Sequence, residues 1–544
     1  MPGRPIVLAL IALFVVLGSL WISRPGLYYD EVLFIQASHP RDDIPIAYTM
    51  HFRGRPVALM LISYLGALKG WLYAPVLRLF PPSAALVRLP MLLAGAAALG
   101  FFYLFARRAF GSTAALGALA LAATDPTYLF TARLDWGPVA IQRLCLAAGC
   151  FAALRWWQKR RSRDLFWGYL AFGLGVFDKA TFLWLLVALG LATALVFSRQ
   201  VWRSLRSQAL PIALAGFLLG SLPFLYYCWK GPGETFRQQR DTPDKYAEKL
   251  RGVQYTLEGV GLIGWFSRDP DLRPASPDSA LARLVYAISP PQPFVETLLL
   301  PACVAALLLL PGLPFHPWGR GMLFLLLFLV FVFVQMLPLQ GAGAAHHLAL
   351  LLPFPQLFVA AGLTGARARL DPWLPRPSLR RAASLVLALV ITLLAAANLR
   401  VVAHHYYRIL AFGGAGGWTE AIYALHQSLE QSRAEKIFLL DWGMMNQLRL
   451  LSRDRLPLVE AAQPQGPEDN APYLQSWLGN PNVLFVKPAP GEPPVFPQVL
   501  VAFGKALRQQ GKEPRIVETV RDYRGRAVYE VLTVKPQMNK DERR

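Results

Sequence analysis

Cysteine is scarce in this chain, with four residues among 544. Cys145, Cys150 and Cys303 fall within apolar runs, Cys228 stands at the end of another, and no cysteine follows residue 303. A disulfide framework and a cysteine-based zinc site are therefore excluded for the C-terminal part of the chain. That part must fold around an apolar core of its own.

Acidic residues are also few, with 33 Asp and Glu against 55 Lys and Arg, which gives a net charge of +22. The sequence has no Gly-rich strand–turn–helix fingerprint for a nucleotide. A strong positive charge indicates nucleic-acid binding when it gathers on one surface, but here it falls in short segments between apolar runs. We therefore expect no nucleic-acid partner.

Apolar residues make up 55% of the chain. Runs of the roughly 20 residues that a spanning helix needs recur from residue 6 to about residue 400 and then stop. The pattern predicts a polytopic α-helical membrane protein with about eleven transmembrane helices over residues 1–400. The predicted spans are centred near residues 6–23, 86–105, 112–130, 137–155, 165–177, 180–198, 209–227, 294–310, 321–338, 347–364 and 382–398.

The charge between these spans predicts their orientation, because cytoplasmic loops carry an excess of Lys and Arg. Basic residues far outnumber acidic ones around residues 107–108, 155–164, 199–206, 320 and 367–381. With these segments inside, the N-terminus is cytoplasmic, and residues 24–85, 228–293 and 401–544 are extracytoplasmic. The first run lacks a small-residue cleavage site before Arg24, so we interpret it as a helix and not as a signal peptide.

The outer segments carry structure of their own. In the first, residues 55–82 have apolar residues at helical spacing, broken by Lys69 and Arg78, which favours one or two interfacial juxtamembrane helices over a short transmembrane pair. The segment 228–293 is long enough to be a lid or an acceptor-binding element. Short strand patterns alternate with helical ones from about residue 417, so we expect a small α/β domain at 401–544. Asp441 at a strand end is interpreted there as a turn residue.

Four groups of charged residues fall on the predicted outer face. They are Asp30 with Glu31, His51 with Arg53 and Arg55, Arg133 with Asp135, and Asp178 with Lys179. Each has an ordinary explanation, such as an ion pair, a wet turn or an arginine that reaches lipid phosphates. Together they predict a site for a phosphate-bearing lipid, with cations for the phosphate and a carboxylate for a reacting hydroxyl.

The order of these motifs resembles that of the GT-C integral membrane glycosyltransferases, in particular the bacterial proteins similar to protein O-mannosyltransferases and to lipid A aminoarabinose transferases. YYDEVLF matches the acidic motif after the first helix of that class, and Arg55-Pro56 introduces the juxtamembrane segment. VRLPMLLAG, TDPTYLFTARLDWGP and GLGVFDKATFLWLL follow in the expected order. The resemblance covers residues 1–200 by motif and the later spans only by hydropathy.

The resemblance implies an inverting hexosyl- or pentosyltransferase of the bacterial cytoplasmic membrane. Such an enzyme moves a sugar from a polyprenyl-phosphate donor to a lipid, polysaccharide or protein acceptor at the outer face. It implies a catalytic role for Asp30, with Glu31 and Asp135 beside it. The resemblance further implies donor-phosphate contacts by Lys179, Arg55 and Arg133.

Three questions stay open at this point. His346 and His347 stand on the outer side, either as phosphate contacts or as residues of a helix entry. A divalent metal held by Asp30, Glu31 or Asp135 is compatible with the sequence but not required by it. A flippase for lipid-linked sugars would place its charges near the bilayer midplane, and a non-catalytic scaffold would leave the charged pairs without a role.

Overall fold

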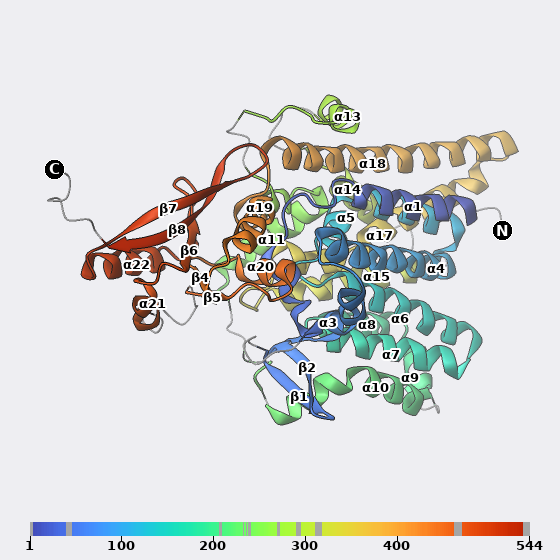
Figure 1. Ribbon diagram of the computed structural model, residues 1–544. Helices are drawn as coiled ribbons and strands as arrows, with labels where there is room; N and C mark the ends of the chain where they lie inside the picture. Colours follow the sequence, from blue (N-terminus) through green and yellow to red (C-terminus); the bar gives the residue numbers. More distant parts are fainter. Residues whose placement is uncertain are drawn as a thin grey trace.

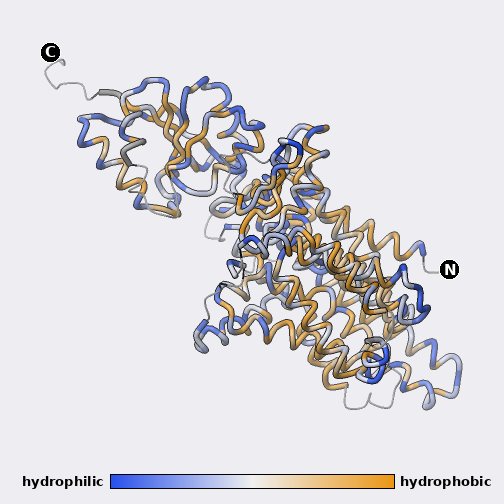
Figure 2. Tube along the Cα trace, turned by 90° about the horizontal axis from the view of Figure 1, so that it is seen from below, coloured by the Kyte–Doolittle hydropathy of each residue, from blue (hydrophilic) through white to orange (hydrophobic). Residues whose placement is uncertain are grey.

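The computed structural model describes residues 4–39, 46–205, 209–231, 233–235, 237, 241–268, 273–289, 295–309, 318–461 and 471–536. It has two parts, a bundle of helices and, at one end of the bundle, a C-terminal domain built on a five-stranded sheet (Figure 1). Hydrophobic residues run along most of the bundle helices, whereas stretches of hydrophilic residues alternate with hydrophobic ones in the C-terminal domain (Figure 2).

Helices of the bundle lie on every predicted span. They are α1 (Arg4–Ser19), α4 (Ala84–Thr124), α5 (Pro126–Arg133), α6 (Ala140–Lys159), α7 (Ser162–Asp178), α8 (Phe182–Val196), α10 (Ala209–Lys230), α14 (Leu299–Leu308), α15 (Gly319–Met336), α17 (Phe354–Leu370) and α18 (Pro377–Phe412). Two predicted spans share α4, whose backbone breaks at Gly111 with φ at +83°. Glycine accepts this conformation because it has no Cβ.

The predicted count of eleven membrane crossings is not confirmed. Within the described residues, five helical stretches are long and apolar enough to cross a membrane. Helices α8 and α9 (Ser198–Leu205), which meet at a bend of 110°, make a sixth if the two are one span. Other bundle helices on predicted spans are shorter, with 16 residues in α1, 15 in α8 and 10 in α14. A hydrocarbon layer about 30 Å thick calls for roughly 20 helical residues.

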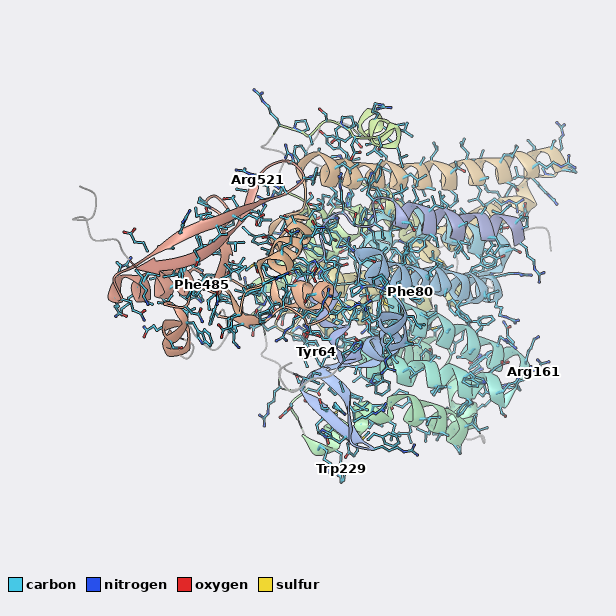
Figure 3. All side chains as sticks on the ribbon, in the orientation of Figure 1. Tyr64, Phe80, Arg161, Trp229, Phe485 and Arg521 are labelled. Atoms are coloured by element: carbon cyan, nitrogen blue, oxygen red, sulfur yellow. The ribbon has the colours of Figure 1, made fainter. Side chains whose placement is uncertain are left out.

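The two ends of the bundle differ in what they carry. The C-terminal domain lies at one end, and the N-terminus lies at the other (Figure 1). Arg161, which belongs to a basic segment predicted to be cytoplasmic, is also at the end remote from the domain (Figure 3). This is the arrangement that the predicted topology requires. The side of the membrane that each end faces stays a prediction.

The first outer segment is only partly helical, and the predicted helix over its first residues is wrong. Strands β1 (Tyr48–Phe52), β2 (Arg55–Ile62) and β3 (Leu65–Gly66) form a small antiparallel sheet, and α3 (Leu68–Leu79) follows. The turn between β1 and β2 has two residues, Arg53 and Gly54, with φ at +51° and +75°. Two-residue hairpin turns favour this left-handed geometry, so residues 55–62 pair as a strand.

Short helical elements lie in the connections between the bundle helices and after α1 and α18. They are α2 (Tyr29–Leu33), η1 (Gln36–Ser38), α16 (Ala345–Leu348), η3 (Ala349–Leu351), η4 (Asp371–Trp373) and η5 (Gly416–Trp418). The long segment 228–293 contains α11 (Asp244–Glu258), α12 (Ile263–Phe266) and α13 (Ala280–Ile288). Its α11 contacts both α14 and α16.

The C-terminal domain alternates helices and strands. Its helices are α19 (Ala421–Ser432), α20 (Met445–Ser452), α21 (Ala471–Trp477) and α22 (Pro497–Gln509), and its strands are β4 (Lys436–Leu439), β5 (Leu458–Glu460), β6 (Val483–Pro488), β7 (Lys512–Arg521) and β8 (Ala527–Pro536). The strand order is β5-β4-β6-β8-β7. Strand β4 is parallel to β5 and β6, and β8 is antiparallel to β6 and β7.

Each face of this sheet has its own apolar core. Phe438, Phe485 and Phe503 pack on one face, and Leu425, Ile437 and Val486 pack on the other. Asp441, after β4, accepts hydrogen bonds from the backbone N–H groups of Val495 and Phe496, at 3.0 and 2.9 Å. These contacts fit the turn role expected for Asp441.

Candidate active site

Asp30 is carried by α2, a single helical turn that follows α1 and contacts α20 of the C-terminal domain. Its side chain is partly buried, and no other described residue forms a hydrogen bond with its carboxylate. Burial raises the pKa of Asp30 to about 6, against the opposing effect of the nearby Lys179 charge. At pH 7 about nine in ten of such carboxylates are ionised, so Asp30 is able to accept a proton.

Glu31, the next residue, is fully buried and has a different environment. Its two oxygens accept hydrogen bonds from Nε and Nη2 of Arg88, at 2.9 and 2.8 Å, and neither side chain is exposed. Arg88 also donates to the carbonyl oxygens of Ile22, Pro25 and Gly26. The predicted catalytic role does not suit Glu31, because its oxygens are occupied and unreachable. Arg88 belongs to the VRLP motif, which the sequence analysis noted without giving Arg88 a role.

Lys179 lies in the turn between α7 and α8, at the edge of the small sheet formed by β1, β2 and β3. It forms a β-bridge with Leu65, and the N–H of Ala180 donates to the carbonyl of Tyr64 at 2.9 Å. Its ammonium donates to the carbonyl of Gly137 at 3.0 Å and lies 6.0 Å from the Tyr64 ring centroid. Tyr64 itself is at the end of the bundle nearest the C-terminal domain (Figure 3). Since an ammonium has three donors, Lys179 has capacity for an anion.

Asp135 forms a buried ion pair that the sequence did not predict. Lys69 of α3 contacts its carboxylate at 2.7 Å, and each side chain is 2% exposed. The other carboxylate oxygen accepts the N–H groups of Val139 and Ala140, at 2.8 and 3.0 Å. Asp135 thus orders the turn before α6 and neutralises Lys69. Lys69 was interpreted only as a break in an apolar helix, since its partner is 66 residues away.

Arg133 is fully buried, and its contacts do not suit the predicted phosphate role. Its Nη atoms donate to the carbonyls of Leu20, Trp21 and Arg24 and to the hydroxyl of Tyr406. These carbonyls belong to the chain that leaves α1. Arg133 therefore anchors the end of α1 to α5 and α18, while no Nη atom is left for a ligand.

His346 and His347, on α16, lie beside the segment that Lys179 contacts. A Cβ on Gly137 would be 2.4 Å from that of His346, so the two backbones approach closely. The ring of His346 also lies near Trp136, with 6.2 Å between centroids, and that of His347 lies near Trp184, at 5.9 Å. His346 is thus grouped with Gly137 and Lys179 by geometry.

Arg55 is exposed at the turn of the β1–β2 hairpin, together with His51 and Arg53. Strand β2 runs from Arg55 to Ile62. At about 3.3 Å per residue, its two ends are roughly 23 Å apart. Since Lys179 contacts the chain at Tyr64 and Leu65, the structure does not bring Arg55 to Lys179.

A metal does not fit the carboxylates that the sequence singled out. Among the described residues, no group of three or more His, Cys, Asp and Glu could hold a metal ion. Glu31 and Asp135 are both neutralised by buried cations and have their oxygens occupied. Asp30 alone does not make a metal site.

The candidate site therefore consists of Asp30, Lys179, the Gly137 carbonyl and His346, drawn from four separate segments. The positive charge of Lys179 favours the ionised form of Asp30. Two buried ion pairs fix the chain next to these residues: Glu31–Arg88 beside Asp30, and Lys69–Asp135 two residues before Gly137. The arrangement presents a proton acceptor and a cation at one end of an apolar bundle.

Comparison with known proteins gives a family match to part of the chain. A family model described as dolichyl-phosphate-mannose-protein mannosyltransferase matches residues 67–227. The matched segment contains Lys69, Arg88, Asp135 and Lys179. No curated protein sequence matches the chain.

Solved structures match over almost the whole length. ArnT from Cupriavidus metallidurans bound to undecaprenyl phosphate aligns with a TM-score of 0.55 and 15% identity, over 96% of this chain and 97% of that one. The apo state of the same protein gives 0.54 and 16%, over 98% of each chain. The Archaeoglobus fulgidus oligosaccharyltransferase in complex with Zn and sulfate gives 0.51 and 13%, over 89% of this chain and 68% of that one.

These matches confirm the resemblance to GT-C membrane glycosyltransferases that the motifs predicted. The chain has an ArnT-like fold that includes the C-terminal domain, because the alignment extends over nearly all of both chains.

Proposed function

We propose that the protein is a glycosyltransferase that moves a sugar from a polyprenyl-phosphate donor to an acceptor hydroxyl, with Asp30 as the general base. The observation that carries the proposal is the placement of Asp30 on α2, which packs against α20 of the C-terminal domain, together with the buried Lys179, whose charge favours the ionised form of Asp30. The family match and the ArnT-like fold support the same reaction class.

In the proposed reaction, the acceptor oxygen attacks the anomeric carbon of the donor sugar from the side opposite the phosphate. The bond from that carbon to the phosphate oxygen breaks, so the configuration inverts. Asp30 takes the hydroxyl proton, and polyprenyl phosphate leaves with the electron pair of the broken bond. A pKa of about 6 suits this step, because a base works best when its pKa lies near the working pH.

Lys179 stabilises the negative charge that grows on the leaving phosphate. Its ammonium is buried and fixed by the Gly137 carbonyl, so it needs little rearrangement to face the phosphate. A fixed cation in a site of low dielectric stabilises a transition state more strongly than a mobile, hydrated one. We assign His346, which lies beside Gly137, to the border of the same phosphate, with the ring of His347 next to it.

We place the reaction at the outer face of the bacterial cytoplasmic membrane. The N-terminus is then cytoplasmic, and the C-terminal domain is extracytoplasmic. The prenyl chain fixes the donor at the membrane surface, which explains why the base sits where the chain leaves a helix. Acceptors of this class are a lipid headgroup, a cell-surface polysaccharide or a protein.

The test is transfer by the purified protein in lipid vesicles. The donors are radiolabelled polyprenyl-phosphate hexoses and pentoses, offered with total envelope extract as acceptor, and a nucleotide sugar is the control donor. We expect label to pass to the acceptor from a polyprenyl-phosphate donor and not from the nucleotide sugar. Movement of the donor between leaflets without sugar transfer would contradict the proposal and identify a flippase.

A further inference from the structure

Residues 25–36, here called the catalytic segment, carry Asp30 and lie between the bundle and the C-terminal domain. The bundle holds this segment through Arg88, which donates to Pro25 and Gly26 and pairs with Glu31. Through α2, the segment also contacts α20 of the C-terminal domain. Asp30 therefore depends for its position on two parts of the chain that are separated by hundreds of residues.

Two buried amides of α20 contact the main chain of the catalytic segment. Gln447, which is fully buried, donates from Nε2 to the carbonyl of Leu27 at 3.2 Å. Asn446, 3% exposed, donates from Nδ2 to the carbonyl of Tyr29 at 3.5 Å and accepts a hydrogen bond from the side chain of Gln36. These contacts reach both sides of Asp30.

Aromatic packing closes the same interface. The ring of Trp418 stacks on Tyr28, with 4.3 Å between centroids and 8° between planes, and Trp442 lies 4.4 Å from Tyr29. Tyr29 also packs against a core of the C-terminal domain. The two residues that precede Asp30 are thus covered by residues far along the chain.

The two backbones meet without space for a side chain. The N–H of Gly26 donates to the carbonyl of Trp418 at 2.6 Å, and a Cβ on Gly26 would lie 2.0 Å from the carbonyl oxygen of Thr419. An α2 turn of five residues is too short to be stable alone. Its geometry must come from these contacts.

We propose that the C-terminal domain completes the active site, with Asn446 and Gln447 as positioning residues that fix the main chain carrying Asp30. The domain is then part of the transferase and not only an acceptor-binding appendage. This inference rests on the proposed function, since it assigns the domain a task in the proton transfer by Asp30. Because a base displaced by about 1 Å loses much of its effect, release of the segment should lower turnover by roughly tenfold or more.

The pH profile distinguishes positioning from mere folding. The titratable groups that interact electrostatically with Asp30 are Lys179 of the α7–α8 turn, Tyr64 between β2 and β3, and Tyr28 and Tyr29 on its own segment. Burial is what raises its pKa. A looser segment admits water, so the acidic limb of the rate profile should move from about pH 6 toward the ordinary aspartate range near 4.

The experiment compares Asn446→Leu/Gln447→Met with wild type in full-length protein. Both changes keep approximate volume and remove the amide donors. Gln509→Ala, which removes an exposed amide of α22 in the same domain, is the matched control. Measurements are kcat, KM for a polyprenyl-phosphate sugar, donor Kd and the pH profile. If the double variant does not purify as a folded protein, the single variants Gln447→Met and Asn446→Leu replace it.

We expect kcat to fall at least tenfold in the double variant, donor Kd to stay within twofold, and the acidic limb to move to lower pH. Gln509→Ala should match wild type. Wild-type kcat with an unmoved acidic limb in the Asn446/Gln447 variants would overturn the inference. Absence of transfer by wild-type protein would instead contradict the proposed function, so the two failures are distinguishable.

Discussion

The buried ion pair of Glu31 and Arg88 contributes to the free energy of unfolding, and the cost of removing it can be estimated from its contacts. Arg88→Met removes the cation and leaves the Glu31 carboxylate buried without a counter-charge, with only the backbone N–H of Tyr28 still donating to it at 2.9 Å. Breaking a buried ion pair in this way costs about 3–5 kcal/mol. The same change strips donors from the carbonyls of Ile22, Pro25 and Gly26. A buried acceptor without a donor adds about 1–3 kcal/mol. The total is a large share of the roughly 5–15 kcal/mol that stabilises a folded protein.

A double variant separates the two costs. Glu31→Met/Arg88→Met also removes the stranded carboxylate, so it should be more stable than Arg88→Met alone, but the three carbonyls remain without donors. Arg455→Met is the control, because Arg455 pairs with Glu430 on the surface, with the side chains 70% and 33% exposed. Exposed pairs of this kind contribute about 1 kcal/mol or less.

The assay is thermal unfolding of each detergent-purified variant at one scan rate. The expected order of Tm loss is largest for Arg88→Met, intermediate for the double variant and smallest for Arg455→Met. Transfer activity should fall with Arg88→Met even below its Tm, because Arg88 holds the backbone before Asp30. A Tm for Arg88→Met no lower than that of Arg455→Met would refute the reasoning.

Three further predictions concern the site and the topology. The kcat/KM of wild type should fall about tenfold per pH unit below about pH 6, because protonation of Asp30 removes the base; a flat profile from pH 7 to 4.5 would argue against it. Lys179→Ala should weaken donor binding by the roughly 1.5–3 kcal/mol of a charge-assisted hydrogen bond, and Asp178→Ala/Lys179→Ala should not recover it; recovery would mean that Lys179 only balances Asp178. In a background without native cysteines, an impermeant thiol reagent added outside cells should label Asn480→Cys and not Arg160→Cys, and the reverse labelling would invert the predicted topology.

Apolar periodicity was sufficient to place the bundle helices, because a run of about 20 apolar residues has few alternatives in a membrane. The hairpin was missed, since VALMLI fits a helix and a strand equally well. The Arg53-Gly54 turn decides between them only once β1 is recognised as its partner. Local patterns thus predict long elements better than short ones.

The sequence predicted that Asp30 and Lys179 lie at the same face of the membrane. Asp30 follows the first predicted span, and Lys179 lies in the turn between two later spans, both on the predicted outer side. It did not predict which charges neutralise each other. The Glu31–Arg88 and Lys69–Asp135 pairs join residues 57 and 66 positions apart. Such pairings depend on how helices pack, and adjacent charges in the sequence, such as Asp30 and Glu31, end in opposite environments.

The most direct test of the central claim is transfer by Asp30→Asn, with donor affinity measured separately. Asparagine keeps the size and removes the basicity, so turnover should fall by roughly 10²-fold or more, while donor Kd and Tm stay near wild type. Asp371→Asn, paired with Arg367 on the surface, is the matched control and should retain wild-type turnover. If Asp30→Asn transfers sugar at the wild-type rate, Asp30 is not the base and the account is wrong.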